Sequence, residues 1–162
     1  MTHRKATPMK RPTRTVSLLA LAVAACIGAL APTTARAAAP AGRYTLATDT
    51  VADTVTHLTW QRSVPTQTYT WAAATTYCQG LSLGGFTSGW RLPTVKELQS
   101  IVDPRAYNPS IDSTAFPATP SNNFWSSSPA AGSPGNAWIV GFYDGGTDGS
   151  GTGYPGQVRC VR

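Results

Sequence analysis

Apolar residues recur at steps of three and four positions in two short parts of the chain, and each part follows a helix-capping residue. In the first part, Trp71, Ala74 and Cys78 fall on one helical face. Thr70 is the expected N-cap and Gly80 the expected left-handed stop. The pattern predicts a helix between these two residues and directs the Cys78 side chain toward the core.

The second part begins with a capping box, in which Thr94 and Glu97 have the S/T-x-x-E spacing. Apolar residues then form one face of residues 95–102, and Asp103, followed by proline, ends the helix. Arg91 lies in the extended segment just before the cap. A guanidinium there is expected to bind loop carbonyls or a carboxylate, with ligand contact as the alternative.

Alternation of polar and apolar or β-branched residues predicts several short strands. Residues 43–60 are expected to form short strands and a hairpin, and residues 124–128 a short strand that enters a loop. The strongest strand is residues 137–143, and the Asp-Gly pair at 144–145 is typical of a hairpin turn. Residues 157–161 are predicted to return as its partner.

The N-terminal part has the pattern of a secretory signal. Residues 1–15 carry five Lys or Arg and no acid, and residues 16–31 form an apolar run. Small residues at 35 and 37 predict cleavage after Ala37, which leaves one domain, residues 38–162. The alternative, a retained membrane anchor, is disfavoured because the run falls short of the roughly 20 residues that a spanning helix needs.

Charge follows the same division. All seven acidic residues lie after position 37, whereas six of the thirteen basic residues lie before it, so the predicted mature domain carries seven of each. The net charge of +6 is therefore a property of the signal. We expect no nucleic-acid partner, and no membrane association once the signal is removed.

Three cysteines divide in the same way. Cys26 lies in the apolar run and leaves with it, whereas Cys78 and Cys160 remain. An even pair in an exported chain favours a disulfide. The alternative makes residues 23–26 a lipoprotein cleavage box with Cys26 acylated, but the hydrophobic run continues to residue 31. We expect export to the periplasm, the cell surface or the medium.

A series of short motifs resembles a known family when taken in order. The motifs are Leu58-Thr59-Trp60-Gln61, Thr70-Trp71, Tyr77-Cys78, Trp90-Arg91-Leu92-Pro93-Thr94 with Glu97-Leu98, Ile111-Asp112, Phe116-Pro117, Phe124-Trp125-Ser126-Ser127, Phe142-Tyr143-Asp144-Gly145-Gly146 and Val158-Arg159-Cys160-Val161-Arg162. Together they resemble the Lcl C-terminal domain family, a bacterial domain of unknown function, over nearly all of residues 44–162.

This resemblance implies an α+β fold of the C-type-lectin-like kind, which formylglycine-generating enzymes share. It implies two short helices, small antiparallel sheets, long loops and a disulfide between Cys78 and Cys160. In the founding member of the family, the domain is the tip of a collagen-like adhesin and is associated with sulfated glycosaminoglycans. Because residues 38–162 carry equal numbers of acidic and basic side chains, polyanion binding by this chain is a weaker expectation than the fold.

Catalysis is not expected. His57 is the single histidine after position 37, and no motif places a serine nucleophile beside it. Chemistry of the formylglycine-generating type needs a reactive cysteine pair, but the two remaining cysteines are the predicted disulfide. We therefore predict that the protein is not an enzyme.

No cofactor is expected either, because one histidine and two bonded cysteines do not make a zinc site. Calcium is the open alternative, since Asp103, Asp112, Asp144 and Asp148 are oxygen donors in predicted turns, although they lack the spacing of an EF-hand loop. The glycine-rich residues 145–153 resemble a phosphate loop only in composition, and we interpret them as a flexible hairpin tip.

The remaining chemistry is that of aromatic side chains near glycine-rich loops, which suit sugar rings and peptides. We predict that Trp125, Tyr143 and Tyr154 contact a ligand together with Ser126 and Asp144. The other tryptophans are assigned to the core, namely Trp60, Trp71, Trp90 and Trp138. The predicted function is an exported binding module for a glycan or another cell-surface partner. The alternative is a structural or assembly domain that forms homo-oligomers or contacts other proteins.

Overall fold

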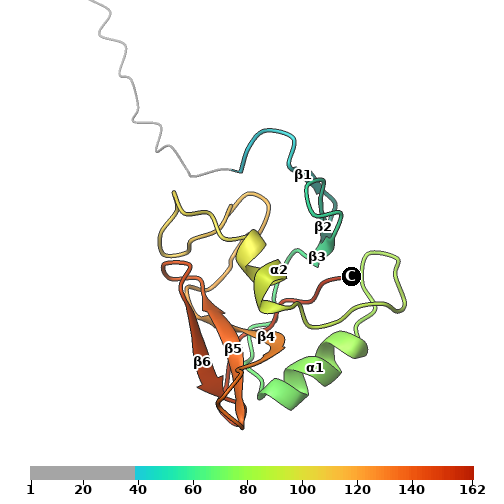
Figure 1. Cartoon of the computed structure of the whole chain (residues 1–162). Coiled ribbons are helices and arrows are strands. Elements are labelled where there is room, and N and C mark those ends of the chain that lie inside the picture. The colour runs from blue at the N-terminus through green and yellow to red at the C-terminus, as the bar shows by residue number, and fades with distance from the viewer. Residues whose placement is uncertain (1–38) are drawn as a thin grey trace, which may run out of the picture. The chain divides into compact units, whose positions relative to one another are not determined.

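Two small antiparallel sheets and two short helices make up the fold (Figure 1). The computed structural model describes residues 39–162, so the predicted signal peptide, its cleavage site and Cys26 lie outside the described residues. The first sheet contains β1 (Tyr44–Leu46), β2 (Thr50–Asp53) and β3 (Thr59–Gln61), and the second contains β4 (Asn123–Pro129), β5 (Asn136–Gly141) and β6 (Thr147–Gly151). The helices are α1 (Trp71–Gln79) and α2 (Val95–Ser100). The α+β prediction, with its long loops, is confirmed.

Helix α1 begins and ends where its sequence signals lie. The Thr70 hydroxyl accepts a hydrogen bond from the Ala73 N–H, and Ala74 and Cys78 are buried on the inner face. Gly80 ends the helix with φ −87°, so the predicted left-handed conformation is wrong. The Gly80 N–H still bonds back to the Thr76 carbonyl, and a right-handed last turn therefore suffices to satisfy it.

Helix α2 starts on the predicted capping box, with both of its hydrogen bonds formed. Arg91 adds a bidentate ion pair to Glu97, with nitrogen–oxygen distances of 2.8 and 2.7 Å. The structural role expected for Arg91 is thus confirmed. The guanidinium and the cap hold the pKa of Glu97 at about 2, below its ordinary 4.5, and the hydrogen bond from Arg91 is the main cause.

The replacement Glu97→Gln is expected to lower the free energy of unfolding by about 1–2 kcal/mol at pH 7. This loss is smaller than the full pKa shift implies, because the side chains of Arg91 and Glu97 are 44% and 23% exposed and solvent screens the pair. A depressed carboxyl pKa stabilises the fold above about pH 4.5, and this contribution disappears as the pH falls toward 2. Urea denaturation of both proteins between pH 7 and 3 should show the difference shrinking, and a constant difference would contradict this assignment.

The partner of β5 differs from the prediction. β5 pairs with β6, inside the glycine-rich stretch, and not with residues 157–161. The Asp144-Gly145 turn reverses the chain at once: Gly145 has φ +86° and its N–H donates to the Gly141 carbonyl. The segment nearest in the chain reaches the free edge of β5 at the least loop-closure cost, which outweighs the low strand propensity of glycine.

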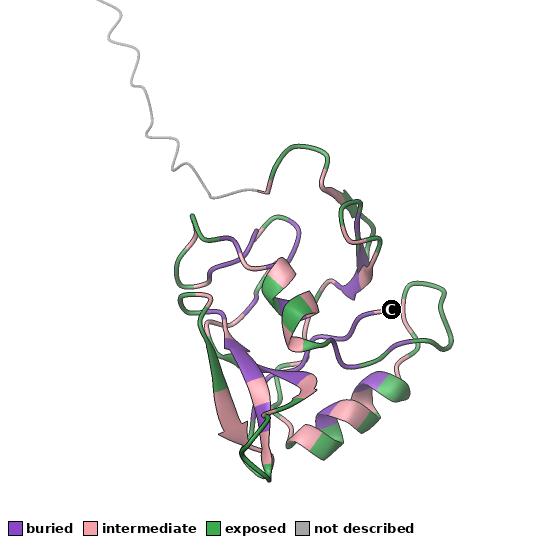
Figure 2. Cartoon of the chain, viewed as in Figure 1, coloured by how far each residue is buried: buried purple, intermediate pink, exposed green. Residues whose placement is uncertain are grey.

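Residues 157–161 instead run between the two sheets as an extended C-terminal segment. Phe124 of β4 pairs with Gln157 in parallel, and Val161 forms antiparallel bridges with Trp60 of β3 and with Arg91. Figure 2 shows this segment buried along nearly all of its length. The C-terminal segment therefore joins the two sheets.

Two hydrophobic clusters form the core on either side of this segment. The first holds Trp60, Phe124 and Val161, and the second holds Trp90 and the disulfide-bonded cysteines. Cys78 and Cys160 are bonded at 2.04 Å, as the family resemblance implied. The core assignment is confirmed for Trp60 and Trp90, whereas Trp71 and Trp138 are only half-buried.

Arg159 is the largest charged group inside the fold and is fully buried. Its Nη2 donates to the Thr119 hydroxyl at 2.7 Å, and its guanidinium lies 4.5 Å from the centre of the Phe116 ring. Burial lowers the pKa of Arg159 to about 9. A cation–π contact and one hydrogen bond stand where a buried arginine usually has a carboxylate partner, and the Nε and Nη1 of Arg159 are buried without a hydrogen-bond partner.

Candidate functional site

Trp125, predicted to contact a ligand, is a core residue with 1% of its surface exposed. Its Nε1–H donates to the Tyr69 carbonyl at 2.8 Å. Gly156 lies against the same ring, and a Cβ at that position would stand 2.7 Å from Nε1. The indole is therefore closed off from solvent.

Ser126, the second predicted contact in this strand, is also fully buried. Its hydroxyl donates to the Trp138 carbonyl at 2.7 Å within the sheet. The expected exposure of this strand is wrong, because β4 is buried on both faces: Phe124 packs into the first cluster and Trp125 into the second. Alternation along a strand identifies two faces but does not say that either one meets water.

Tyr143 is exposed as predicted, and it forms a pair with Tyr107. The two ring centres lie 4.5 Å apart at an interplanar angle of 63°, and the residues are 48% and 63% exposed. The Asn108 N–H donates to the Tyr143 carbonyl at 2.9 Å, which joins the two loops that carry the rings. A side-chain hydrogen bond with Tyr143 raises the pKa of Tyr107. We call Tyr107 and Tyr143 the tyrosine pair.

Asp144 lies next to the tyrosine pair and is also exposed. One carboxylate oxygen accepts the Gly146 N–H at 2.9 Å, which fixes the side chain over the turn. It lines a hollow of about 240 Å³, here the acidic hollow, formed by Asn123, Ile139, Gly141, Asp144, Gly146, Thr147 and Asp148. The hollow thus offers two carboxylates and an amide as hydrogen-bond acceptors, and the chain links it to the tyrosine pair through the neighbours Tyr143 and Asp144.

Tyr154, although 69% exposed, lies away from these residues. Tyr143 follows β5 at the turn, whereas Tyr154 follows β6 at the opposite end of the hairpin. Five strand residues separate the two ends, a distance of about 16 Å. The structure therefore brings Tyr143 and Asp144 together and places Tyr154 outside their site.

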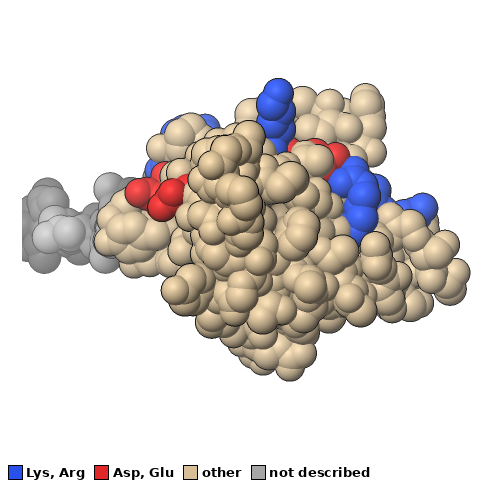
Figure 3. Space-filling view, turned by 60° about the horizontal axis from the view of Figure 1, so that its bottom comes forward, with Lys and Arg blue, Asp and Glu red and all other residues tan. Residues whose placement is uncertain are grey.

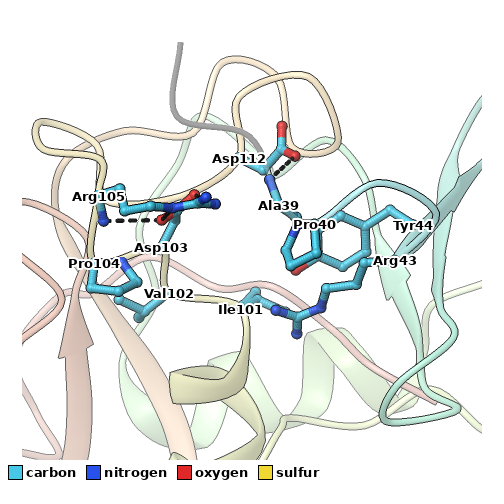
Figure 4. Close-up of a pocket in the computed structure, with 10 residues that line it drawn as sticks. All are labelled: Ala39, Pro40, Arg43, Tyr44, Ile101, Val102, Asp103, Pro104, Arg105 and Asp112. Carbon is cyan, nitrogen blue, oxygen red and sulfur yellow. Dashed lines mark hydrogen bonds and ion pairs between the residues drawn. The ribbon is translucent and has the colours of Figure 1, made fainter. Parts of the chain in front are cut away.

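A second hollow, of about 230 Å³, lies where the N-terminal segment meets the loop after α2 (Figure 4). Its charged groups already have partners: Asp103 pairs with Arg105 at 3.0 Å, and Asp112 accepts the Ala39 N–H at 2.9 Å. Arg43 reaches away to the Asp53 carboxylate at 2.8 Å. These contacts hold the N-terminal segment in place and leave Asp103 and Asp112 engaged in structural roles.

The titratable groups are dispersed. No group of three or more His, Cys, Asp or Glu able to hold a metal ion occurs within residues 39–162. His57 is exposed in the turn between β2 and β3, with φ 59°, and its N–H donates to the Asp53 carbonyl at 2.8 Å. The chemistry that the tyrosine pair and the acidic hollow offer is therefore aromatic contact and hydrogen-bond acceptance.

Comparison with known proteins gives one family match. The family model described as the Lcl C-terminal domain matches residues 49–162. The match takes in both helices, the second sheet, the disulfide and the tyrosine pair, and β1 precedes it. A search of curated proteins finds no match.

Proposed function

Because the chain belongs to the Lcl C-terminal domain family, we propose that it is an exported, non-catalytic module that binds a glycan or another cell-surface ligand. The disulfide supports export, since such bonds persist in oxidising compartments. Neither of the helices described in residues 39–162 has the length and apolar character needed to span a bilayer. Periplasm, cell surface and medium are all compatible with these features.

The observation that carries the proposal is the exposed tyrosine pair, whose Tyr143 is followed in the chain by Asp144 of the acidic hollow. A tyrosine ring offers an apolar face and a polar hydroxyl, and it loses little conformational entropy on binding. Contact between the rings and the Asn108–Tyr143 hydrogen bond hold this pair in place before a ligand arrives. Asp144 and Asp148 accept hydrogen bonds from hydroxyl or amide groups beside the rings.

The alternative is an assembly domain, and the edges of the two sheets favour it. Within the described chain, β1 and β6 each pair with a strand on one side only. An unpaired edge is a template for pairing with another copy or another protein. On β6 only Asp148 carries a charge that opposes such pairing. A stable homo-oligomer that retains no glycan would favour this alternative.

The replacement Tyr143→Ala is expected to weaken ligand retention about fivefold or more, since one aromatic contact is typically worth about 1 kcal/mol. The measurement is a glycan and glycosaminoglycan array probed with the full-length protein, with calcium and with chelator. Tyr154→Ala is the matched control, because it removes a tyrosine that is more exposed but lies at the other end of the hairpin. Equal losses in both variants would contradict the assignment.

The same array separates the remaining alternatives. If the protein bound no glycan on the array, with or without calcium, the glycan proposal would be refuted. Retention that chelator abolishes would show that calcium is required and reverse the expectation that no cofactor takes part. A change of more than about 1 kcal/mol in the free energy of unfolding of the Tyr143→Ala variant would indicate a packing role for this exposed ring.

A further inference from the structure

A trough lies next to the acidic hollow, with which it shares Asn123. Two adjoining hollows, of about 350 and 190 Å³, share Asn122 and Gln157. We call them together the amide trough, which is lined by Val64, Pro65, Thr66, Thr68, Ala118, Pro120, Asn122, Asn123, Pro155, Gly156 and Gln157. Asn123 lines the acidic hollow as well, so the two sites are neighbours.

The floor of the amide trough is held rigidly from both sides. Gly156 exchanges two backbone hydrogen bonds with Tyr69, at 2.8 and 2.9 Å. The Gln157 N–H donates to the Asn123 carbonyl at 2.9 Å, and the Gln157 carbonyl accepts from the Trp125 N–H at 3.0 Å. The backbone groups of the floor are thus already paired, and recognition in the trough falls to side chains.

The Gln157 side chain stands out in this floor. The residue is 5% exposed, and its Oε1 has no hydrogen-bond donor. Buried polar atoms in folded proteins nearly always have a partner, because leaving one unpaired is costly. Rotation of the amide can present either an acceptor or a donor, which suits a hydroxyl group that can act as both.

The trough also lacks charge. None of its lining residues is Lys, Arg, Asp or Glu, and none of these types occurs in residues 63–90, 113–143 or 149–158. Figure 3 shows a face of the molecule with a broad uncharged centre and charged side chains near its margin. A sulfated or carboxylated group would lose hydration in the trough without gaining a counter-charge.

We propose that the amide trough binds two or three rings of a neutral, hydroxyl-rich oligosaccharide, with the Gln157 amide hydrogen-bonded to a sugar hydroxyl. Pro65, Pro120 and Ala118 provide apolar walls for the C–H faces of the rings. An extended peptide fits less well, because it would seek free backbone groups, and those of the floor are paired. The inference rests on the proposed function and names an uncharged ligand class for it.

The decisive variant is Gln157→Met, which removes the amide and keeps the length of the side chain. Binding of short neutral oligosaccharides to the full-length protein, measured by calorimetry, is expected to weaken about tenfold or more. The denaturation midpoint should stay unchanged or rise, because the variant removes an unpaired buried oxygen. A residue with only a structural role would show the reverse, namely lost stability and retained affinity.

Asn122→Ala gives a second variant at an exposed position in the trough, and its affinity should fall about threefold or more. Lys96→Ala, at an exposed position on α2 that lines neither the trough nor the acidic hollow, is the control and should bind the short oligosaccharides as the parent does. In ¹H–¹⁵N spectra, the side-chain amide signals of Gln157 and Asn122 should shift on titration.

Three results would overturn the proposal: no shift with any neutral oligosaccharide, unchanged affinity in both trough variants, or shifts of these amides with a proline-rich peptide alone. Binding of charged glycans only, lost in Tyr143→Ala, would refute the trough while leaving the proposed function standing. A protein that binds no glycan of either kind would refute both.

Discussion

Replacing Trp125 with alanine is expected to lower the free energy of unfolding by about 3–5 kcal/mol. The indole is almost fully buried, so its removal leaves a cavity next to the Gly156 backbone. It also removes the donor to the Tyr69 carbonyl. Guanidinium denaturation, followed by far-ultraviolet circular dichroism, measures the change as a shift of the midpoint.

Two control variants separate packing from ligand contact. Trp125→Phe keeps most of the ring volume and loses the N–H donor, so a smaller loss of about 1–2 kcal/mol is expected. Tyr143→Ala, at an exposed ring, should change stability by less than about 1 kcal/mol. If Trp125→Ala abolished ligand binding while the midpoint stayed in place, the core assignment of this residue would be wrong.

Removing the disulfide by the double replacement Cys78→Ala and Cys160→Ala is expected to cost about 4 kcal/mol. The bond closes a loop with a sequence separation of 82 residues, and most of its effect is the restriction of the unfolded chain. Net stabilities of small domains are about 5–15 kcal/mol, so this loss is a large share. Thermal and guanidinium denaturation of the oxidised parent and the double variant measure it.

Reduction of the parent provides the matched control. After reduction and alkylation, the intact mass should increase by the mass of two alkyl groups, one each on Cys78 and Cys160. Without reduction, neither of these cysteines should be alkylated. The reduced, alkylated parent should unfold at a lower denaturant concentration than the oxidised protein. Equal midpoints would mean that the loop is already restricted in the unfolded state and that the estimate from chain entropy does not apply.

The helices could be predicted because their signals are local. Thr70 and the Thr94–Glu97 box act within one turn of the residues that they cap, so no distant contact was needed to place them. The pairing of β5 could not be predicted from propensity alone. Glycine is a poor strand former, yet residues 147–151 form β6 because the turn before them places them beside β5.

Only the part of the candidate site that adjoins a turn could be predicted from the sequence. Tyr143 and Asp144 flank a turn that the sequence marks, so their exposure followed from the turn itself. Tyr107 lies in an irregular loop without periodicity, and only the folded chain brings it to Tyr143. Trp125 was misassigned because the burial of both faces of β4 depends on segments distant in the chain.

The C-terminal segment also determines when the two sheets of a newly made chain can finish folding. The edges of β3 and β4 that it covers, and one half of the disulfide, are completed only when residues 157–162 are in place. A chain emerging N-terminus first therefore carries two incomplete sheets until residues 157–162 become available. A nascent chain in which residues 157–162 are still held back would stay open at both sheet edges.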